Sequence, residues 1–469
     1  MTNSATPGPP ISAGAQAAVV AARLDRIPPN RFHHGLVGML AGGTFFDAFD
    51  ALSIAVALTV IVKYFGISFS TAGLIISAGY LGQLVGALVV GALSERIGRR
   101  RTFIAAIVAF SVLSIAAALS WSATSLLVFR MLQGLGLGAE VPIAGTLLNE
   151  FLGAKHRGRM GMLYESAFTW GILIAPLAGV ILIGGLGPDV GWRWLFALGA
   201  LPLLLAAVVW RRLPESPRWL AEHGRTEEAE RIVARIEAVA RERGDELPAY
   251  RPAPPQAAHR LRPAELFSAP YRRRTGMLWA TWFFTYFITY GFSVWLPTLY
   301  VELGGLSPSR SLVLTVILGA AQLIAAYVGV ALVDRIGRMP LLLAGFIIMA
   351  VGCGFGTLGV SVLNMTAWPV LFTAGITTAV GATLPAILLY LYTAELYPTR
   401  MRGWGTAAGS SMNRLASILS PILVGQILSR GGGITAVFSA FLLAALIGLA
   451  VLATTGIETR NRPLEELAH

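Results

Sequence analysis

The sequence predicts an all-α membrane protein with twelve transmembrane helices arranged in two related six-helix bundles. Three observations support this fold class: long apolar segments, positive charge in alternate loops, and an internal repeat. Of the 469 residues, 55% are hydrophobic and only 13% are charged, whereas soluble domains average about 25% charged residues. A helix of about 20 apolar residues crosses the ~30 Å hydrocarbon core of a bilayer.

The apolar segments follow one another from residue 35 to residue 456. Each is long enough for one membrane crossing, and an even number of crossings returns the chain to the side where it began. We expect spans at about 35–62, 71–93, 102–120, 124–150, 160–184, 192–210, 276–300, 309–333, 340–361, 367–392, 404–428 and 434–456.

The net charge of +12 is concentrated in alternate loops. Arg and Lys gather in residues 96–101, 155–159, 211–274, 335–338, 400–402 and 460–462, whereas the intervening loops hold few. This asymmetry follows the positive-inside rule. It predicts a multi-pass membrane protein with both termini in the cytoplasm, and it argues against nucleic-acid binding. The single cysteine, Cys353, excludes an internal disulfide.

Two halves of the chain repeat each other. Residues 95–99 (Glu-Arg-Ile-Gly-Arg) match residues 334–338 (Asp-Arg-Ile-Gly-Arg), and four further positions recur 245 residues later: Glu150, Arg157, Gly158 and Pro176 match Glu395, Arg402, Gly403 and Pro421. Repeats of this kind are typical of transporters whose site lies between the halves, near the membrane midplane. We expect a flexible cytoplasmic tail (1–32), a first bundle (33–210), a cytoplasmic linker (211–275), a second bundle (276–457) and a second tail (458–469).

The linker contains one expected helix. Residues 227–243 place apolar side chains at helical spacing, which is typical of a helix lying on the cytoplasmic face. Thr226 is the expected N-cap and Gly244 the expected end.

Charged residues inside the spans carry the functional prediction. An ionised side chain at the bilayer centre costs about 3 kcal/mol or more, so such residues usually serve function. Asp47 and Asp50 share one helix face in the first span, and Arg130 lies at a similar depth in the fourth. We interpret all three as proton-coupling residues; the alternative is that the acids are structural partners of an arginine. Glu140 is a second proton site, or a partner of Arg130 or of a backbone group.

Arg414 is the charged residue inside a span of the second half that carries a functional prediction. It lies about eleven positions past Gly403, near mid-membrane, beside Asn413. A planar guanidinium is suited to bidentate capture of a carboxylate, so we expect Arg414 to bind an organic anion. The alternative is that Arg414 pairs with Glu140 or Asp47 across the halves.

Aromatic and amide side chains complete the expected substrate site. Tyr286 and Tyr290 share a face of the seventh span and are placed to meet a ring. The ordinary role of such side chains is helix packing. The remaining candidates are Trp170, Tyr390, Gln83 and Gln322.

Charged residues at the cytoplasmic ends of the spans are the expected gate. Acids there can pair with arginines placed at the negative ends of helices, and such pairs would break when the halves rock; the alternative is that the arginines only set topology. The expected gating residues are Glu95, Arg96, Arg99, Glu150, Arg157, Asp334, Arg335, Glu395 and Arg402.

Several of these segments resemble one family. Residues 91–101 (Gly-Ala-Leu-Ser-Glu-Arg-Ile-Gly-Arg-Arg-Arg), 130–138, 214–220 (Pro-Glu-Ser-Pro-Arg-Trp-Leu) and 395–403 are similar to signature motifs of the major facilitator superfamily. The resemblance implies alternating access and, for Asp50 and Arg130, the proton couple of sugar porters. Residues 138–142, 164–166 and 290–297 most resemble bacterial nicotinate transporters, and the Asp-x-x-Asp pattern of Asp47 and Asp50 is similar to that of aromatic-acid:proton symporters. These resemblances imply a bacterial inner membrane protein.

The sequence therefore predicts a proton-coupled importer of a small aromatic carboxylate, with nicotinate first. The alternatives are a sugar or polyol symporter, a drug or organic-cation efflux antiporter, and a receptor without flux. No nucleotide-binding loop, zinc-ligand spacing or nucleophile elbow occurs in the sequence, so we expect no enzyme, no cofactor and no metal. We expect a monomer that binds an organic anion and protons.

Overall fold

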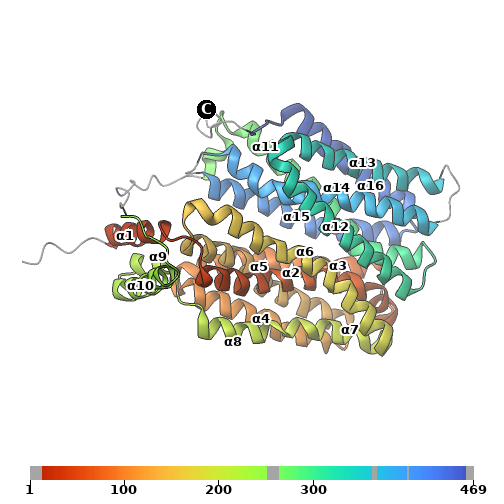
Figure 1. Cartoon of the computed structure of the whole chain (residues 1–469). Helices are drawn as coiled ribbons and strands as arrows, with labels where there is room; N and C mark the ends of the chain where they lie inside the picture. Colours follow the sequence, from red (N-terminus) through yellow and green to blue (C-terminus); the bar gives the residue numbers. More distant parts are fainter. Residues whose placement is uncertain (1–12, 251–262, 362–366, 399–400, 461–469) are drawn as a thin grey trace, which may run out of the picture.

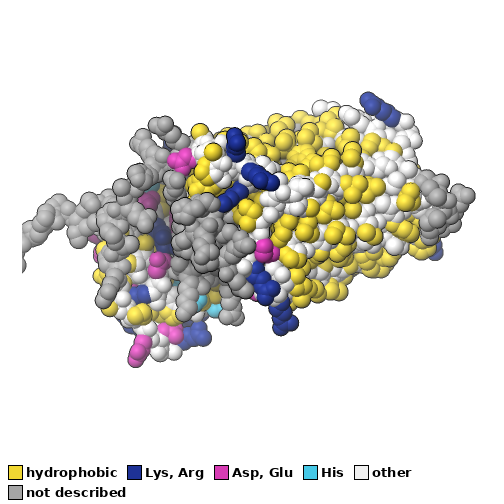
Figure 2. Space-filling model, turned by 90° about the horizontal axis from the view of Figure 1, so that it is seen from above, with side chains coloured by type: hydrophobic (Ala, Val, Ile, Leu, Met, Phe, Trp, Pro, Cys, Tyr) yellow, Lys and Arg dark blue, Asp and Glu magenta, His cyan; other side chains and the backbone are white. Residues whose placement is uncertain are grey.

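The computed structural model describes residues 13–250, 263–361, 367–398 and 401–460. Within these ranges every regular element is helical. The helices form two bundles that lie side by side, with the N-terminal half of the chain in one and the C-terminal half in the other (Figure 1). Figure 2 shows one face, on which hydrophobic side chains form a broad belt and charged side chains lie mainly toward one end. The all-α membrane fold expected from the sequence is confirmed.

Six spans build the first bundle, and the sixth is interrupted by a short 3-10 turn. A Pro at the second position after that turn restarts the helix, which suits the fixed φ of proline. The elements are α2 (Arg31–Phe65), α3 (Phe69–Ile97), α4 (Arg99–Ala118), α5 (Ala123–Phe151), α6 (Ala154–Leu186), and α7 (Pro188–Ala197) with η1 (Leu198–Ala200) and α8 (Pro202–Arg212).

Six further spans build the second bundle: α11 (Arg272–Glu302), α12 (Pro308–Ile336), α13 (Arg338–Ser361), α14 (Ala367–Leu396), α15 (Arg402–Ser429) and α16 (Ile434–Thr455). Ten spans of the two bundles are both long and apolar enough to cross a membrane within the described ranges. The other two, α11 and α15, have 31 and 28 residues and are long enough, but they carry more polar side chains.

The expectation of a flexible tail over residues 1–32 is wrong for residues 13–25, which form α1 (Ala13–Asp25). Residues 1–12 lie outside the described part. Val20, Leu24 and Ile27 are at most 2% exposed, because they pack in one apolar cluster with the buried stripe of α10 (Thr226–Glu242). The periodicity that predicted a surface helix therefore reflects burial under α1, and not contact with a membrane.

The linker carries two helices beside α1, namely α9 (Pro217–Glu222) and α10. The N-cap of α10 is Arg225, without a side-chain cap, so the assignment of Thr226 as N-cap is wrong. The Thr226 hydroxyl donates to Gln16 of α1 instead. Gly244 follows the helix with φ +85°, as expected for a glycine that ends a helix. A short 3-10 turn, η2 (Pro263–Phe267), precedes the second bundle.

Glycines let α3 and α5 approach each other closely. A Cβ on Gly138 would lie 1.9 Å from the Gln83 carbonyl oxygen, and one on Gly82 would lie 2.0 Å from the Met131 carbonyl oxygen. Only glycine fits such backbone contacts. This packing fixes the position of the polar face of α3 relative to α5, and both helices carry candidate site residues.

The two bundles are joined at the end opposite α10. Thr59 donates to Thr298 at 3.1 Å, and Lys63 pairs with Glu302 at 3.4 Å. Further toward the middle, the Ser77 hydroxyl donates to the Ile418 carbonyl at 2.7 Å. Between described residues, no hydrogen bond or ion pair joins the bundles on the α10 side of Gln83. The hydrogen bonds and ion pair that described residues form between the halves therefore lie at the end opposite α10 and near the middle.

Charge holds α1 on α10. The Glu237 carboxylate accepts from Arg23 Nη2 at 2.8 Å and from Arg26 Nη2 at 2.7 Å. Burial alone would raise the pKa of Glu237, but the two arginines outweigh burial, and the net effect is a pKa below the ordinary 4.5. A carboxylate whose pKa is lowered in the folded state stabilises that state above its ordinary pKa, and this contribution is lost as the pH falls through the folded-state value.

We predict that α1 loosens from α10 as the pH falls below 4.5, because Glu237 then takes up a proton and loses its attraction for Arg23 and Arg26. Hydrogen–deuterium exchange of residues 16–25 measures this opening. Glu237→Gln should show fast exchange in this segment at neutral pH and little further change on acidification. Equal protection in the variant and the wild type would contradict the prediction.

Candidate functional site

A closed ion pair lies in the middle of the first bundle. Arg130 Nη1 on α5 donates to both carboxylate oxygens of Asp50 on α2, each at 2.7 Å, and to Gln133 Oε1 at 3.1 Å. Gln133 Nε2 donates in turn to Asp50 at 2.9 Å. The side chains of Arg130 and Asp50 are 6% and 3% exposed. The oxygens of Asp50 are thus satisfied by a cation and an amide, and Arg130 is not available to Glu140.

Arg414 on α15 has a different kind of partner. Its Nη1 donates to the amide oxygen of Gln83 on α3, and Gln83 Nε2 donates to Asp47 at 3.4 Å. Among the described residues Arg414 has no carboxylate within 4.0 Å, so a direct ion pair with Asp47 or Glu140 is not formed. The guanidinium therefore sits between the two halves beside a neutral amide, and Asp47 lies behind that amide.

A row of aromatic rings borders this position. The ring centroids of Tyr286 and Tyr290 are 5.8 Å apart with planes at 26°, and those of Trp282 and Tyr286 are 5.5 Å apart at 18°. Tyr80 of the first half meets Tyr290 edge to face at 5.0 Å, and Tyr390 meets Trp282 at 4.8 Å. We call the five residues Tyr80, Tyr290, Tyr286, Trp282 and Tyr390 the aromatic wall.

Glu140 is buried without a partner. The residue is 3% exposed, and neither carboxylate oxygen has a hydrogen-bond partner in the described part of the chain. A Cβ on Gly43 would lie 2.2 Å from Glu140 Oε1, so α2 makes room for this carboxyl group. The Thr44 and Tyr164 hydroxyls are likewise buried. Of the alternatives open at the level of sequence, pairing with Arg130 or a backbone group is not observed.

The other expected substrate residues are placed less decisively. Asn413 and Gln322 are 6% and 5% exposed, and the Asn413 Oδ1 atom is buried and unpaired. Trp170 is 45% exposed and makes no ring contact with the aromatic wall within the described ranges. Glu165, one position after Tyr164, interacts electrostatically with Tyr286, Tyr390 and Asp47. Glu165 is not among the substrate residues expected from the sequence. An acidic residue inside an apolar span is a signal that could have identified it.

The ion pairs formed by the expected gating residues at the α10 end lie within each half. Arg99 pairs with Glu150 at 3.4 Å in the first half, and Arg338 pairs with Glu395 at 2.9 Å in the second. Asp334 also pairs with Arg338 at 3.0 Å. Arg157 and Arg402 each donate to the backbone carbonyl five positions earlier, at 2.9 and 3.2 Å, and Arg157 lies 3.7 Å from Asp25. The side chains of Glu95, Arg96 and Arg335 are exposed.

Two further acids occupy equivalent positions at helix N-termini. Glu215 Oε1 accepts from the backbone nitrogens of Arg99 and Arg100 at 2.9 Å, at the start of α4. Glu458 accepts from the backbone nitrogens of Arg338 and Met339 at 3.1 and 2.9 Å, at the start of α13. An acid at a helix N-terminus satisfies free N–H groups and complements the helix dipole. The two halves are thus built alike here.

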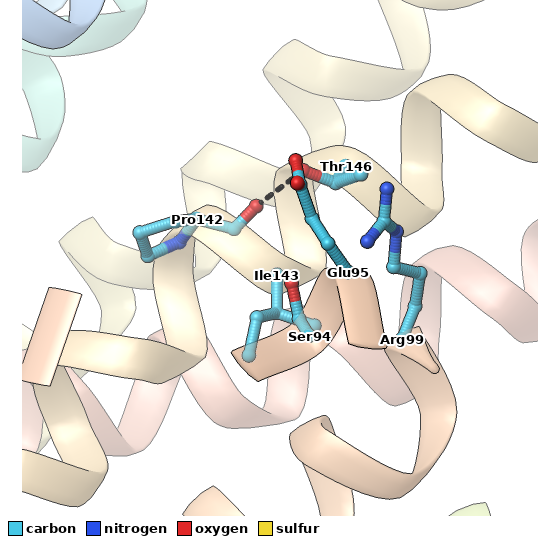
Figure 3. A pocket seen from close by; sticks show the side chains of 6 residues that line it. All are labelled: Ser94, Glu95, Arg99, Pro142, Ile143 and Thr146. Atoms are coloured by element: carbon cyan, nitrogen blue, oxygen red, sulfur yellow. Dashed lines mark hydrogen bonds between the residues drawn. The ribbon is translucent and has the colours of Figure 1, made fainter. Parts of the chain in front are cut away.

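A surface pocket lies between α3, α4 and α5 at the same end (Figure 3). It is lined by Ser94, Glu95, Arg99, Pro142, Ile143 and Thr146. The Thr146 hydroxyl donates to the Pro142 carbonyl at 2.8 Å within α5. The pocket shares no lining residue with the aromatic wall or with Arg414, so it is separate from the candidate site. No group of three metal-ligating side chains occurs among the described residues.

Two helical bundles with buried charge between and within them define a membrane transporter. The chain belongs to the family described as "Sugar (and other) transporter", whose model matches residues 36–469. This membership confirms the predicted major facilitator fold and makes the chain a transporter, and not an enzyme.

Three known proteins illustrate the relationship. The niacin transporter NiaP of Acinetobacter baylyi is 34% identical over 447 residues, covering 95% of this chain and 98% of that protein. A gallate transporter of Pseudomonas putida is 31% identical, covering 89% and 91%. The structure of the xylose transporter XylE from E. coli in an inward-open conformation has a TM-score of 0.74 at 19% identity, covering 93% and 99% of the two chains.

We predict that Arg130→Met destabilises the protein by about 3–5 kcal/mol, because it leaves Asp50 charged and buried beside a neutral amide. The double variant Arg130→Met/Asp50→Asn should lose less than the single variant, since no charge is then stranded. Thermal unfolding in detergent measures both. Additive losses would show that the two side chains are not coupled.

Proposed function

We propose that the protein is a proton-coupled importer of a small aromatic carboxylate, with nicotinate as the first candidate. The observation that carries this proposal is the state of Arg414: a guanidinium between the two halves whose hydrogen-bond partner is an amide. Such a group binds a planar carboxylate through two parallel hydrogen bonds. The aromatic wall beside it offers offset-stacking partners for a ring. The niacin and gallate transporters among its relatives carry names that match this chemistry.

We infer that the end carrying α10 is cytoplasmic and that this structure is an inward-facing state. The excess of Arg and Lys in the loops at that end supports the orientation. The bonds that described residues form between the halves, from Lys63–Glu302 to Gln83–Arg414, lie on the other side or near the middle. In this scheme the Arg99–Glu150 and Arg338–Glu395 pairs hold each half rigid while the halves rock.

The proton-coupling proposal assigns different states to the buried acids. Asp50 is ionised, because Arg130 and Gln133 satisfy its oxygens. Glu140 is protonated, because an ionised carboxylate without a partner would be strongly disfavoured at this depth. Asp47 links these two acids to the substrate site, because Gln83 donates a hydrogen bond to Asp47 and accepts one from Arg414. A proton taken up from outside at these acids would offset the charge of the arriving anion and would leave toward the cytoplasm.

A sugar is the less favoured substrate. Two of the five rings of the aromatic wall already use their polar atoms within the protein: Trp282 Nε1 donates to Thr393 at 3.0 Å, and the Tyr286 hydroxyl donates to the Ala386 carbonyl at 3.4 Å. These two rings therefore offer no free polar atom to the hydroxyls of a polyol, and unpaired hydroxyls are costly.

The test is uptake by proteoliposomes under an imposed pH gradient, acid outside. We predict that the wild type accumulates nicotinate and that Asp50→Asn abolishes gradient-driven accumulation while leaving counterflow, because exchange needs no net proton movement. Arg414→Ala should lose nicotinate transport in both assays.

Arg430→Ala is the matched control, because it removes the same charge from the exposed end of α15. It should transport normally. Accumulation that persists in Asp50→Asn would contradict the proton-coupling proposal, and nicotinate exchange that persists in Arg414→Ala would contradict the anion site.

A further inference from the structure

Gln83 connects the two halves in the middle of their helices. It is the central residue of α3, with fourteen residues on either side, and Arg414 lies twelve residues after the start of α15. The Gln83 amide oxygen accepts from Arg414 Nη1, and Gln83 Nε2 makes a longer, weaker hydrogen bond of 3.4 Å to Asp47. A guanidinium only donates hydrogen bonds and an ionised carboxylate only accepts them. A single orientation of the amide therefore satisfies both neighbours, with its oxygen facing Arg414.

This hydrogen bond lies at the inner end of a line of contacts between α3 and α15. Toward the end opposite α10, the Ser77 hydroxyl donates to the Ile418 carbonyl at 2.7 Å, and a Cβ on Gly73 would lie 2.6 Å from a backbone carbonyl oxygen of α15. The Gln83–Arg414 bond follows in the direction of α10. When two halves rock about the middle of the membrane, a contact near the middle changes its length less than contacts further out. This bond is therefore the one most easily kept during the movement.

The main chain of Gln83 is held in place by α5, and the side chain is the part that is free to turn. A Cβ on Gly138 would lie 1.9 Å from the Gln83 carbonyl oxygen, and one on Gly134 would lie 2.9 Å from the Gln83 nitrogen. Gln83 itself is 4% exposed. A change of partner at Arg414 thus requires a rotation of the Gln83 side chain and no displacement of α3.

Arg414 requires an acceptor whenever no substrate is bound. An import cycle without exchange ends with the return of the empty protein, so the halves must close around Arg414 in the absence of an anion. A charged donor that is buried without a partner is strongly disfavoured. The Gln83 oxygen supplies an acceptor in this step. Carboxylate oxygens are acceptors of the same kind, and their charge-assisted bonds are about twice as strong, so an anion can displace the amide.

We propose that Gln83 is a positioning residue that takes the place of the substrate in the empty transporter: its amide oxygen satisfies Arg414 while the empty protein returns, and the substrate carboxylate displaces it. The inference rests on the proposed function and adds to it a role for the empty state. It also separates Gln83 from the substrate contacts, because the amide bond to Arg414 is made when the substrate is absent. Loss of the amide should therefore slow the return step and spare the loaded step.

The first measurement compares net uptake with exchange in proteoliposomes that contain the full-length protein. Net uptake of labelled nicotinate under a pH gradient requires the return of the empty protein, whereas exchange against internal nicotinate requires only movements of the loaded protein. Gln83→Leu offers no acceptor to Arg414. It should slow net uptake roughly tenfold or more and change exchange less than twofold. Equal losses in both assays, or net uptake at the wild-type rate, would overturn the inference.

The second measurement is the affinity of the full-length protein for nicotinate, determined by calorimetry in detergent. Gln83→Leu should bind nicotinate at least as tightly as the wild type, because no amide has to be displaced. Gln83→Glu places a carboxylate against Arg414 and should weaken binding roughly tenfold or more at pH 7. Weaker binding by Gln83→Leu would identify Gln83 as a substrate contact and overturn the inference, and so would an unchanged affinity in Gln83→Glu.

Gln426→Leu is the matched control, because it makes the same substitution at an exposed glutamine of α15. It should change neither measurement. Thermal unfolding shows whether each variant is folded, and Gln83→Met, which keeps the unbranched shape of glutamine, repeats both measurements if Gln83→Leu is unstable. If the wild type binds nicotinate through Arg414 but the Gln83 variants behave otherwise than expected, the inference fails and the proposed function stands. A wild type that neither binds nor transports nicotinate overturns both.

Discussion

The two buried arginines, Arg130 and Arg414, have opposite kinds of hydrogen-bond partner. A charge placed among transmembrane helices is normally matched by an opposite charge. Arg130 follows this rule, because Asp50 and Gln133 surround it. Arg414 does not, because its partner is the neutral amide of Gln83. One site is therefore electrically complete in this state, and in the proposed function an anion completes the other. Under that proposal, the combination links the charge of a substrate to the protonation of the acids beside it.

In the proposed alternating-access cycle, the repeat lets the site open on either side. Each half has the same two interactions at the α10 end. An acid, Glu215 or Glu458, accepts hydrogen bonds at a helix N-terminus, and an Arg–Glu ion pair lies beside it. These bonds are internal to a half and survive a rigid-body movement. The bonds between halves are few and include hydroxyl pairs such as Thr59–Thr298. Single hydrogen bonds contribute about 1 kcal/mol each, so they can be exchanged for others when the halves rock.

Much of the fold could be read from the sequence, because span length and loop charge are set by the bilayer. The Asp50–Arg130 pair could also be anticipated as one of two alternatives, since the helical rise fixes the depth of both residues. The partner of Arg414 could not, because it depends on how α3 and α15 are rotated about their axes. The sequence did not predict α1, because its apolar face can be recognised as a buried face only once α10 is known to pack against it.

The most direct measurement of the central claim is an experimental structure of the protein with 5-bromonicotinate, in which the bromine is located by its anomalous signal. The account predicts a ligand carboxylate within hydrogen-bond distance of Arg414, with the guanidinium released from Gln83 and the ring against Tyr286 and Tyr290. A ligand bound elsewhere, with the Arg414–Gln83 hydrogen bond intact, would contradict it.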